Sequence, residues 1–126
     1  LARGKALIEQ VPADFAVYSG DDPTAVDLIL LGGKGNISVT ANVAPAKTAK
    51  AAELALQGKA AEAKAVDASL LGLHKNLFLE SNPIPVKWAC EQLGLCDSGI
   101  RLPLTYFADS FHAPVIEAMK QAEVID

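Results

Sequence analysis

Cysteine, methionine and aromatic residues are scarce in this sequence, and their scarcity excludes several classes of protein. The chain has 126 residues, of which two are Cys, one is Met and one is Trp, and aromatic residues make up 6%. The spacing of Cys90 and Cys96 matches neither a zinc site nor a redox motif, and two cysteines build no disulfide framework. We therefore expect no metal and a reduced, cytoplasmic setting.

Excess positive charge and long apolar runs are also missing. The formal net charge is -4, which argues against a broad nucleic-acid or anionic-membrane surface, because both need clustered Lys and Arg. The longest apolar candidate, Ala25–Leu31, is interrupted by Asp27 and falls far short of the roughly 18 residues of a membrane helix. Glu9 and Gln10 follow the basic start of the chain, so no signal peptide is expected. Nucleic acid and membranes are therefore not expected as partners.

Alanine and other hydrophobic residues are abundant instead. Hydrophobic residues make up 51% of the chain, and its length suffices for one domain with a core. Because alanine favours helix, we expect mainly helical structure. The chain begins with Leu1, and its only methionine is Met119. We expect it to be part of a longer protein.

Two short strand patterns alternate with helix patterns in residues 1–43. Each strand pattern is a short run rich in strand-forming residues and bounded by turn residues. The predicted order is helix, strand, helix, strand, at Ala2–Val11, Phe15–Ser19, Pro23–Leu31 and Asn36–Thr40. A helix between two strands favours a parallel sheet. Because two strands alone leave open edges, we expect the neighbouring strands to lie upstream.

Residues 44–126 contain only helix patterns. Helices are predicted at Pro45–Gln57, Lys59–Leu79, Val86–Leu93 and Ala113–Val124, with a loop at Leu95–Thr105. The predicted fold class is therefore α/β and predominantly helical, with the strands confined to residues 1–43.

Polar residues follow the first predicted strand, where parallel α/β folds gather their functional groups. Asp21 and Asp22 are paired carboxylates, which can act as acid and base or hold a metal. The pattern favours a plainer interpretation, in which Asp22 caps the following helix and Asp21 is solvated. Ser19 and Ser38 have no recognisable His and acid partners, so a nucleophilic triad is unsupported.

Other candidate groups also have plainer interpretations. The glycine cluster at Gly32–Gly35 resembles a phosphate loop, but it precedes a strand, so a helix C-cap is favoured. Lys87 is a candidate imine-forming lysine, although an exposed charge is favoured at a helix start. His74 and His112 lack ligands at metal spacing, which favours a polar surface or a hydrogen-bonded interior.

Three segments carry a resemblance to a known family. Ser19–Asp22, Leu31–Asn42 and Asn82–Lys87 closely resemble the dihydrodipicolinate synthase family, and Leu102–Leu104 fits it too. The resemblance covers essentially the whole chain. Related aldolases that act on N-acetylneuraminate or keto-sugar acids share the barrel but do not usually have the Asn-Pro-Ile-Pro-Val-Lys motif of the third segment.

The resemblance implies a (βα)₈ TIM barrel with extra C-terminal helices. It implies an enzyme that condenses pyruvate with aspartate semialdehyde in diaminopimelate and lysine biosynthesis. Pyruvate forms an imine with a lysine on the sixth strand, a tyrosine and threonine relay moves protons, and an arginine binds the aldehyde. The family is usually homotetrameric, is often inhibited by lysine, and needs no cofactor.

Aligned to the family, Leu1 falls just after the sixth strand, so the imine lysine, the relay and the arginine are expected upstream. The two predicted strands then correspond to the last two βα units of the barrel. Gly20 and Ile37 match positions that line the pyruvate pocket, and in the family the carbonyl of Ile37 faces the imine centre. Ser38 and Val39 continue this wall. The resemblance therefore implies a C-terminal piece of a pyruvate-dependent lyase that is inactive alone.

Two alternatives remain open on the residues alone. The helices of residues 44–126 can form a self-standing interaction or oligomerisation module. A sibling aldolase with another aldehyde partner, such as an N-acetylneuraminate or keto-sugar-acid lyase, also fits a barrel of this kind.

Overall fold

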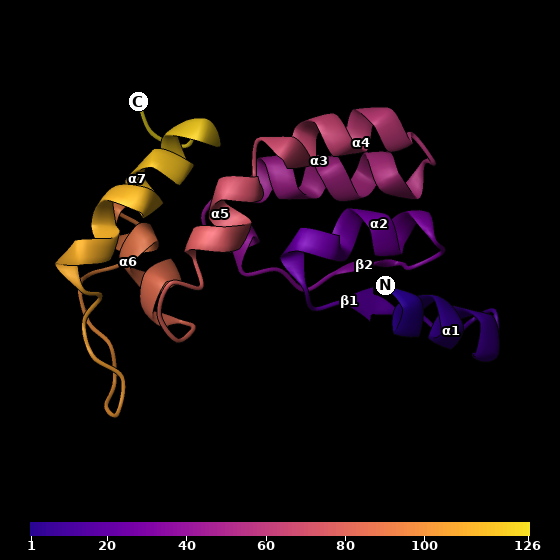
Figure 1. Ribbon diagram of the computed structural model, residues 1–126, viewed down its shortest axis with the longest axis horizontal. Coiled ribbons are helices and arrows are strands. Elements are labelled where there is room, and N and C mark those ends of the chain that lie inside the picture. The colour runs from indigo at the N-terminus through magenta and orange to yellow at the C-terminus, as the bar shows by residue number, and fades with distance from the viewer.

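The computed structural model describes all 126 residues and shows an elongated, mainly helical arrangement. The N-terminal helix α1 (Ala2–Gln10) and the C-terminal helix α7 (His112–Gln121) lie at opposite ends of the molecule (Figure 1). A small parallel sheet lies beside α1, the helix that joins its strands covers it, a helical hairpin packs on that helix, and the last helices form a separate cluster at the other end (Figure 1). The prediction of a mainly helical chain with little sheet is confirmed.

The N-terminal part follows the predicted order of helix, strand, helix and strand. Its elements are α1 (Ala2–Gln10), β1 (Tyr18–Ser19), the 3-10 turn η1 (Asp22–Thr24), α2 (Ala25–Leu30) and β2 (Gly35–Asn36). The strands pair in parallel, with Tyr18 opposite Gly35 and Ser19 opposite Asn36. The predicted parallel pairing is therefore confirmed, although each strand has only two residues.

The predicted strand at Asn36–Thr40 is wrong over most of its length. Asn36 is the last strand residue, Val39 has the helical dihedral angles φ -73 and ψ -44, and Thr40–Asn42 form the 3-10 turn η2. The backbone N–H groups of Val39 and Thr40 donate to the side-chain carboxylate of Asp22 instead of to a neighbouring strand. The β-branched composition of this run predicted a strand, but the hydrogen bonds to Asp22 turn its backbone out of the sheet.

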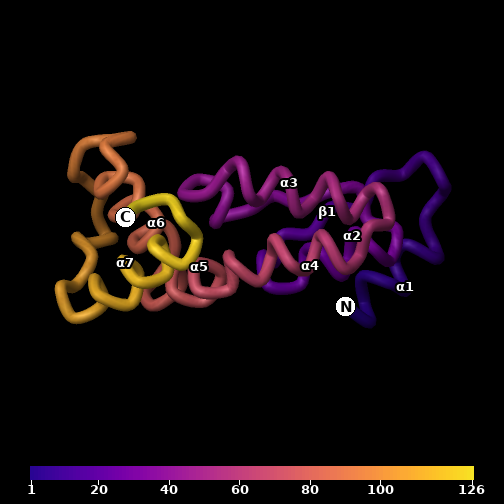
Figure 2. The backbone as a smooth tube through the Cα atoms, turned by 90° about the horizontal axis from the view of Figure 1, so that it is seen from above, coloured from indigo at the N-terminus to yellow at the C-terminus, as the bar shows by residue number.

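Three helices share a small core. Helices α3 (Pro45–Leu56) and α4 (Ala60–Ala68) form a hairpin that packs on α2, and Figure 2 shows them running alongside it. Their buried contacts are mainly alanine and branched side chains: Val26, Ile29, Ala51, Leu54, Ala55 and Ala63. Residues on both sides of Ala44 therefore contribute to one core.

The single helix predicted at Lys59–Leu79 is wrong, because the chain breaks into α4 and α5 (Leu71–Asn76). At the break, the Ser69 hydroxyl donates to the carbonyl of Val66 at 2.8 Å. The apolar spacing of three and four residues continues across the break, but it serves two different cores. Ala63 packs in the small core, whereas Leu70 and its successors pack in the large one.

The large core lies at the C-terminal end of the molecule. Helices α5, α6 (Ile84–Gln92) and α7 (His112–Gln121) surround fourteen buried residues between Val43 and Ala122. The short 3-10 turn η3 (Asp109–Phe111) leads into α7, and residues 95–105 form the predicted loop. None of the helices has both the length and the apolar character that crossing a membrane requires.

Candidate functional site

The two strands end at the same edge of the sheet and place the predicted pocket residues there. The N–H of Ile37 donates to the carbonyl of Ser19 at 2.8 Å, so the pairing extends one residue beyond β2. Gly20 follows Ser19 directly, and a Cβ built on it would meet no atom within 4 Å. Ile37 is 75% exposed, which is unusual for a large aliphatic side chain. This edge of the sheet therefore presents an open, partly apolar surface.

A groove of about 560 Å³ begins at this edge and runs along α6. One wall consists of Ile37, Ser38 and Val39, and the other includes Val86 and Lys87. The structure thus joins two segments that the sequence presented separately, the end of the second strand and the motif at Asn82–Lys87. Gly20, the fourth predicted pocket residue, does not line the groove.

Lys87 and two thiols face the same groove. Lys87 is exposed, which confirms the interpretation of it as a surface charge. Burial, and to a lesser degree nearby Cys96, raises the pKa of the Cys90 thiol above its ordinary value. The Cys90 Sγ donates to the Asn42 carbonyl at 3.6 Å. Because a thiol with a raised pKa stays protonated at neutral pH, Cys90 is a poor nucleophile.

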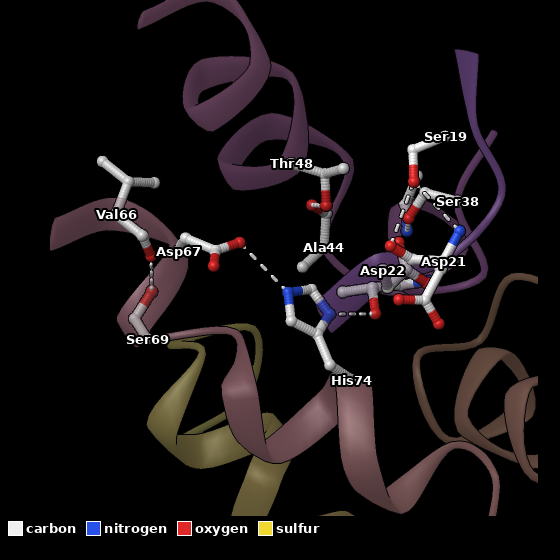
Figure 3. Close-up of polar contacts among 12 residues, drawn as sticks. Ser19, Asp21, Asp22, Ser38, Ala44, Thr48, Val66, Asp67, Ser69 and His74 are labelled. Atoms are coloured by element: carbon white, nitrogen blue, oxygen red, sulfur yellow. Dashed lines mark hydrogen bonds and ion pairs between the residues drawn. The ribbon is translucent and has the colours of Figure 1, made fainter. Parts of the chain in front are cut away.

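Asp22 reaches from the start of α2 to the groove wall. Its side chain is buried, with 5% exposure, and its Oδ2 accepts the N–H groups of Val39 at 2.9 Å and Thr40 at 3.0 Å (Figure 3). The other oxygen, Oδ1, is buried and has no hydrogen-bond partner. The prediction that Asp22 caps its own helix is therefore wrong. It bonds instead to backbone 17 and 18 residues further along the chain.

Asp21 behaves as the plainer interpretation predicted. It is exposed, and its carboxylate accepts the hydroxyl of Thr24 on the same turn. The two neighbouring carboxylates thus point into different surroundings, so the disfavoured alternative of an acid and base pair does not form. No group of three or more His, Cys, Asp or Glu side chains in the chain is arranged to hold a metal ion.

His74 joins the groove wall to the helices behind it. It is 4% exposed, its Nδ1 lies 2.8 Å from the Thr40 Oγ1, and its Nε2 lies 3.1 Å from the Asp67 Oδ1 (Figure 3). Because an ionised carboxylate only accepts, we assign the ring proton to Nε2, and Nδ1 then accepts the Thr40 hydroxyl. The prediction of a hydrogen-bonded interior histidine is confirmed. Sequence reasoning missed Thr40 and Asp67, which lie 34 and 7 residues away.

The glycine cluster and His112 also take their plainer roles. The N–H groups of Gly32 and Gly33 donate to the carbonyls of Ile29 and Leu28 at 2.9 and 3.0 Å, which closes the C-terminus of α2. His112 stacks on Trp88 with ring centroids 4.1 Å apart, and its Nε2 donates to the Phe107 carbonyl at 3.2 Å. Gly32 and Gly33 therefore act as a helix C-cap, and His112 packs against aromatic residues of the large core.

Comparison with known proteins places these features in a family context. A model of the dihydrodipicolinate synthetase family matches residues 1–122. The chain is 61% identical over 122 residues to the 4-hydroxy-tetrahydrodipicolinate synthase of Cellvibrio japonicus (strain Ueda107), covering 97% of this chain and 42% of that protein. It is 57% identical over 125 residues to the synthase of the same name from Pseudomonas aeruginosa, covering 99% of this chain and 43% of that protein.

Solved structures agree with the sequence matches. The chloride-inhibited dihydrodipicolinate synthase of Acinetobacter baumannii, complexed with pyruvate, superposes with a TM-score of 0.95 at 50% identity, over 98% of this chain and 43% of that one. Dihydrodipicolinate synthase from Aquifex aeolicus superposes with a TM-score of 0.92 at 36% identity, over 98% of this chain and 42% of that one. The chain thus spans less than half the length of these relatives.

Proposed function

The chain belongs to the dihydrodipicolinate synthetase family, and we propose that it forms the C-terminal part of a pyruvate-dependent lyase. The complete enzyme condenses pyruvate with aspartate semialdehyde in diaminopimelate and lysine biosynthesis. The match along almost the whole chain, at 61% identity to a 4-hydroxy-tetrahydrodipicolinate synthase, is the observation that carries this proposal. As in the family, the reaction proceeds through an imine and needs no cofactor.

In this proposal, β1 and β2 are the seventh and eighth strands of a TIM barrel, and the first six precede Leu1. The open sheet supports this placement, because two parallel strands of two residues each leave their edges unpaired. Phe15 and Tyr18 are large apolar side chains that lie exposed beside this sheet. A barrel closes only when all of its strands are present, and the preceding strands would cover these side chains.

We assign Gly20, Ile37, Ser38 and Val39 to the wall of the pyruvate pocket. The groove supports this assignment for the last three, because they line one side of it. As in the family, the carbonyl of Ile37 faces the imine centre in this proposal, where it can accept a hydrogen bond. Gly20 leaves room at the strand end, since nothing lies within 4 Å of the position a Cβ would take.

The chain alone is inactive in this proposal, because it lacks the imine lysine. An imine-forming lysine needs a desolvated position that lowers its pKa. Lys34 lies exposed in the turn before β2, and Lys87 lies exposed on α6. Neither position removes water from the amine, so the catalytic lysine, the proton relay and the arginine belong to the upstream part. The complete enzyme is a cytoplasmic homotetramer.

Trapping with borohydride tests the proposal. The 126-residue chain, treated with pyruvate and borohydride, should keep its mass. A hybrid, in which the upstream part of the Cellvibrio japonicus synthase is joined to Leu1, should gain one reduced pyruvate adduct and condense pyruvate with aspartate semialdehyde. An adduct on Lys34 or Lys87 of the chain alone contradicts the placement. Turnover of N-acetylneuraminate in place of aspartate semialdehyde supports the sibling aldolase.

A second candidate is a self-standing helical module in residues 44–126. It is favoured by the large core, because thirteen of its fourteen buried residues lie within this range, Val43 being the exception, and none comes from the strands. Size-exclusion chromatography and circular dichroism of the isolated chain distinguish the two candidates. A monomer with cooperative helical unfolding supports the module, whereas aggregation supports an incomplete barrel with open strand edges.

A further inference from the structure

We propose that Asp22 is a positioning residue, which fixes the backbone of residues 37–40 and thereby the wall of the pyruvate pocket. The inference rests on the proposed function, because the wall matters only where pyruvate binds beside it. Asp22 itself is buried and does not line the groove, so it has no path to the substrate. Its effect on the reaction passes through the segment that it holds.

Two anchors fix the ends of the exposed wall. The N–H of Ile37 is held by the carbonyl of Ser19 at 2.8 Å, and the N–H of Val39 is held by Asp22 at 2.9 Å. The carbonyl of Ile37 lies between these two anchors. Ile37 is 75% exposed, so side-chain packing contributes little to its position. The orientation of this carbonyl therefore depends on the hydrogen bonds at both ends.

The Asp22 anchor is stronger than an ordinary turn hydrogen bond. One carboxylate oxygen accepts two backbone N–H groups, and hydrogen bonds to an ionised acceptor are about twice as strong as neutral ones. Asp22 is also only 5% exposed, so bulk water cannot readily replace its carboxylate as the acceptor of these hydrogen bonds. Removing it leaves two N–H groups without an acceptor and frees the backbone after Ile37.

Thr40 is also held by His74, so residues 37–40 lie between Asp22 on one side and helix α5 on the other. The Thr40 side chain is fully buried at 0% exposure, and its hydroxyl donates to the His74 ring. Asp67 on α4 fixes that ring through its other nitrogen. On the C-terminal side of Ile37, Asp22 is thus the nearest anchor, and the His74 contact with Thr40 supports it.

Kinetics of the hybrid enzyme test the role of Asp22. Asp22→Ala should lower kcat/KM for pyruvate by about 10-fold to 100-fold, the effect of a small misplacement near the chemistry, and should leave KM for aspartate semialdehyde nearly unchanged. Asp22→Asn should recover most of this loss, because the amide oxygen still accepts both N–H groups. Asp27→Ala is the matched control, since Asp27 is an α2 carboxylate that pairs with Lys64 at 2.9 Å, and it should change kcat/KM little.

The outcomes separate the positioning role from mere stability and from the proposed function. A melting temperature that falls in Asp22→Ala while kcat/KM for pyruvate stays unchanged contradicts the positioning role. If Asp22→Ala does not fold, Asp22→Glu replaces it, because the longer side chain keeps the charge and misplaces the oxygen. An inactive unmodified hybrid contradicts the proposed function alone. Amide exchange then decides, since Val39 and Thr40 should lose protection in Asp22→Ala but not in Asp27→Ala.

Discussion

The hydroxyl of Thr40 donates to the ring of His74 across 2.8 Å, and both side chains are buried. This contact ties the end of the sheet to α5, which belongs to the C-terminal core. Because both side chains are buried, removing one leaves the other without its hydrogen-bond partner.

We expect Thr40→Val to destabilise the chain by about 1–3 kcal/mol, because the isosteric change leaves the His74 Nδ1 buried without a donor. The free energy of unfolding, measured by urea titration, checks this value. Thr24→Val is the control, since its hydroxyl bonds to the exposed Asp21, and it should cost less than about 0.5 kcal/mol. Equal costs for the two variants contradict the role of the buried hydrogen bond.

Gly33→Ala should also destabilise the fold, because an added Cβ would lie 2.9 Å from the carbonyl oxygen of Leu28. That oxygen is backbone and accepts the N–H of Gly33, so it cannot move away without breaking the end of α2. Overpacking of this kind costs about 1–3 kcal/mol. Gly20→Ala, where nothing lies within 4 Å, should leave the melting temperature almost unchanged.

The ion pair between Lys47 and Glu123 should make a small contribution to stability that depends on pH. The Nζ and Oε2 atoms lie 2.7 Å apart, and the hydrogen bond and charge of Lys47 lower the pKa of the Glu123 carboxyl. A carboxyl with a lowered folded pKa stabilises the fold above its unfolded pKa and loses this effect as the pH falls through the folded value.

Glu123→Gln should therefore lower the melting temperature slightly at pH ~7, and the difference should vanish as the pH falls below the ordinary glutamate range. Added salt should also reduce it, because Glu123 is exposed. Glu117→Gln, an exposed change on α7, serves as the control. A difference that persists in strong acid contradicts the ion pair as its source.

Cys96 should react with iodoacetamide faster than Cys90. Burial raises the pKa of Cys90, which leaves less of it as the reactive thiolate at a given pH, whereas Cys96 is exposed. The reaction is followed at pH ~8, which is near the ordinary thiol pKa. Mass spectrometry of peptides from a time course measures both rates. Faster labelling of Cys90 would contradict this burial and show that reagent reaches the Cys90 thiol freely through the groove.

The helices were predictable from local signals, and the strands only in part. Pro45 and Gly58 mark the two ends of the predicted third helix, and α3 lies between them. The break at Ser69 escaped prediction, because the apolar spacing continues through it and only the change from one core to another reveals it. The second strand ends at Asn36, earlier than predicted, because the N–H groups of Val39 and Thr40 bond to the distant carboxylate of Asp22.

The site residues divide in the same way. Ile37, Ser38 and Val39 could be named from a motif, and they do lie together in the groove. Asp22 was expected at a helix start, but its bonds to residues 17 and 18 positions away depend on how the two strands pair. No spacing rule links Asp67, His74 and Thr40, because they come from three separate elements that only the folded chain brings together.

The core that α2 shares with α3 and α4 has a practical meaning for recombination within this family. A crossover at Ala44 would combine an α2 from one parent with a helical hairpin from another, and their alanine-lined contact would have to match by chance. A crossover near Ser69 keeps this packing intact, and of the large core it separates only Val43 and Ala44 from the other members, although it also divides His74 from Thr40 and Asp67. Exchange of segments between homologous synthases should therefore succeed more often at that position.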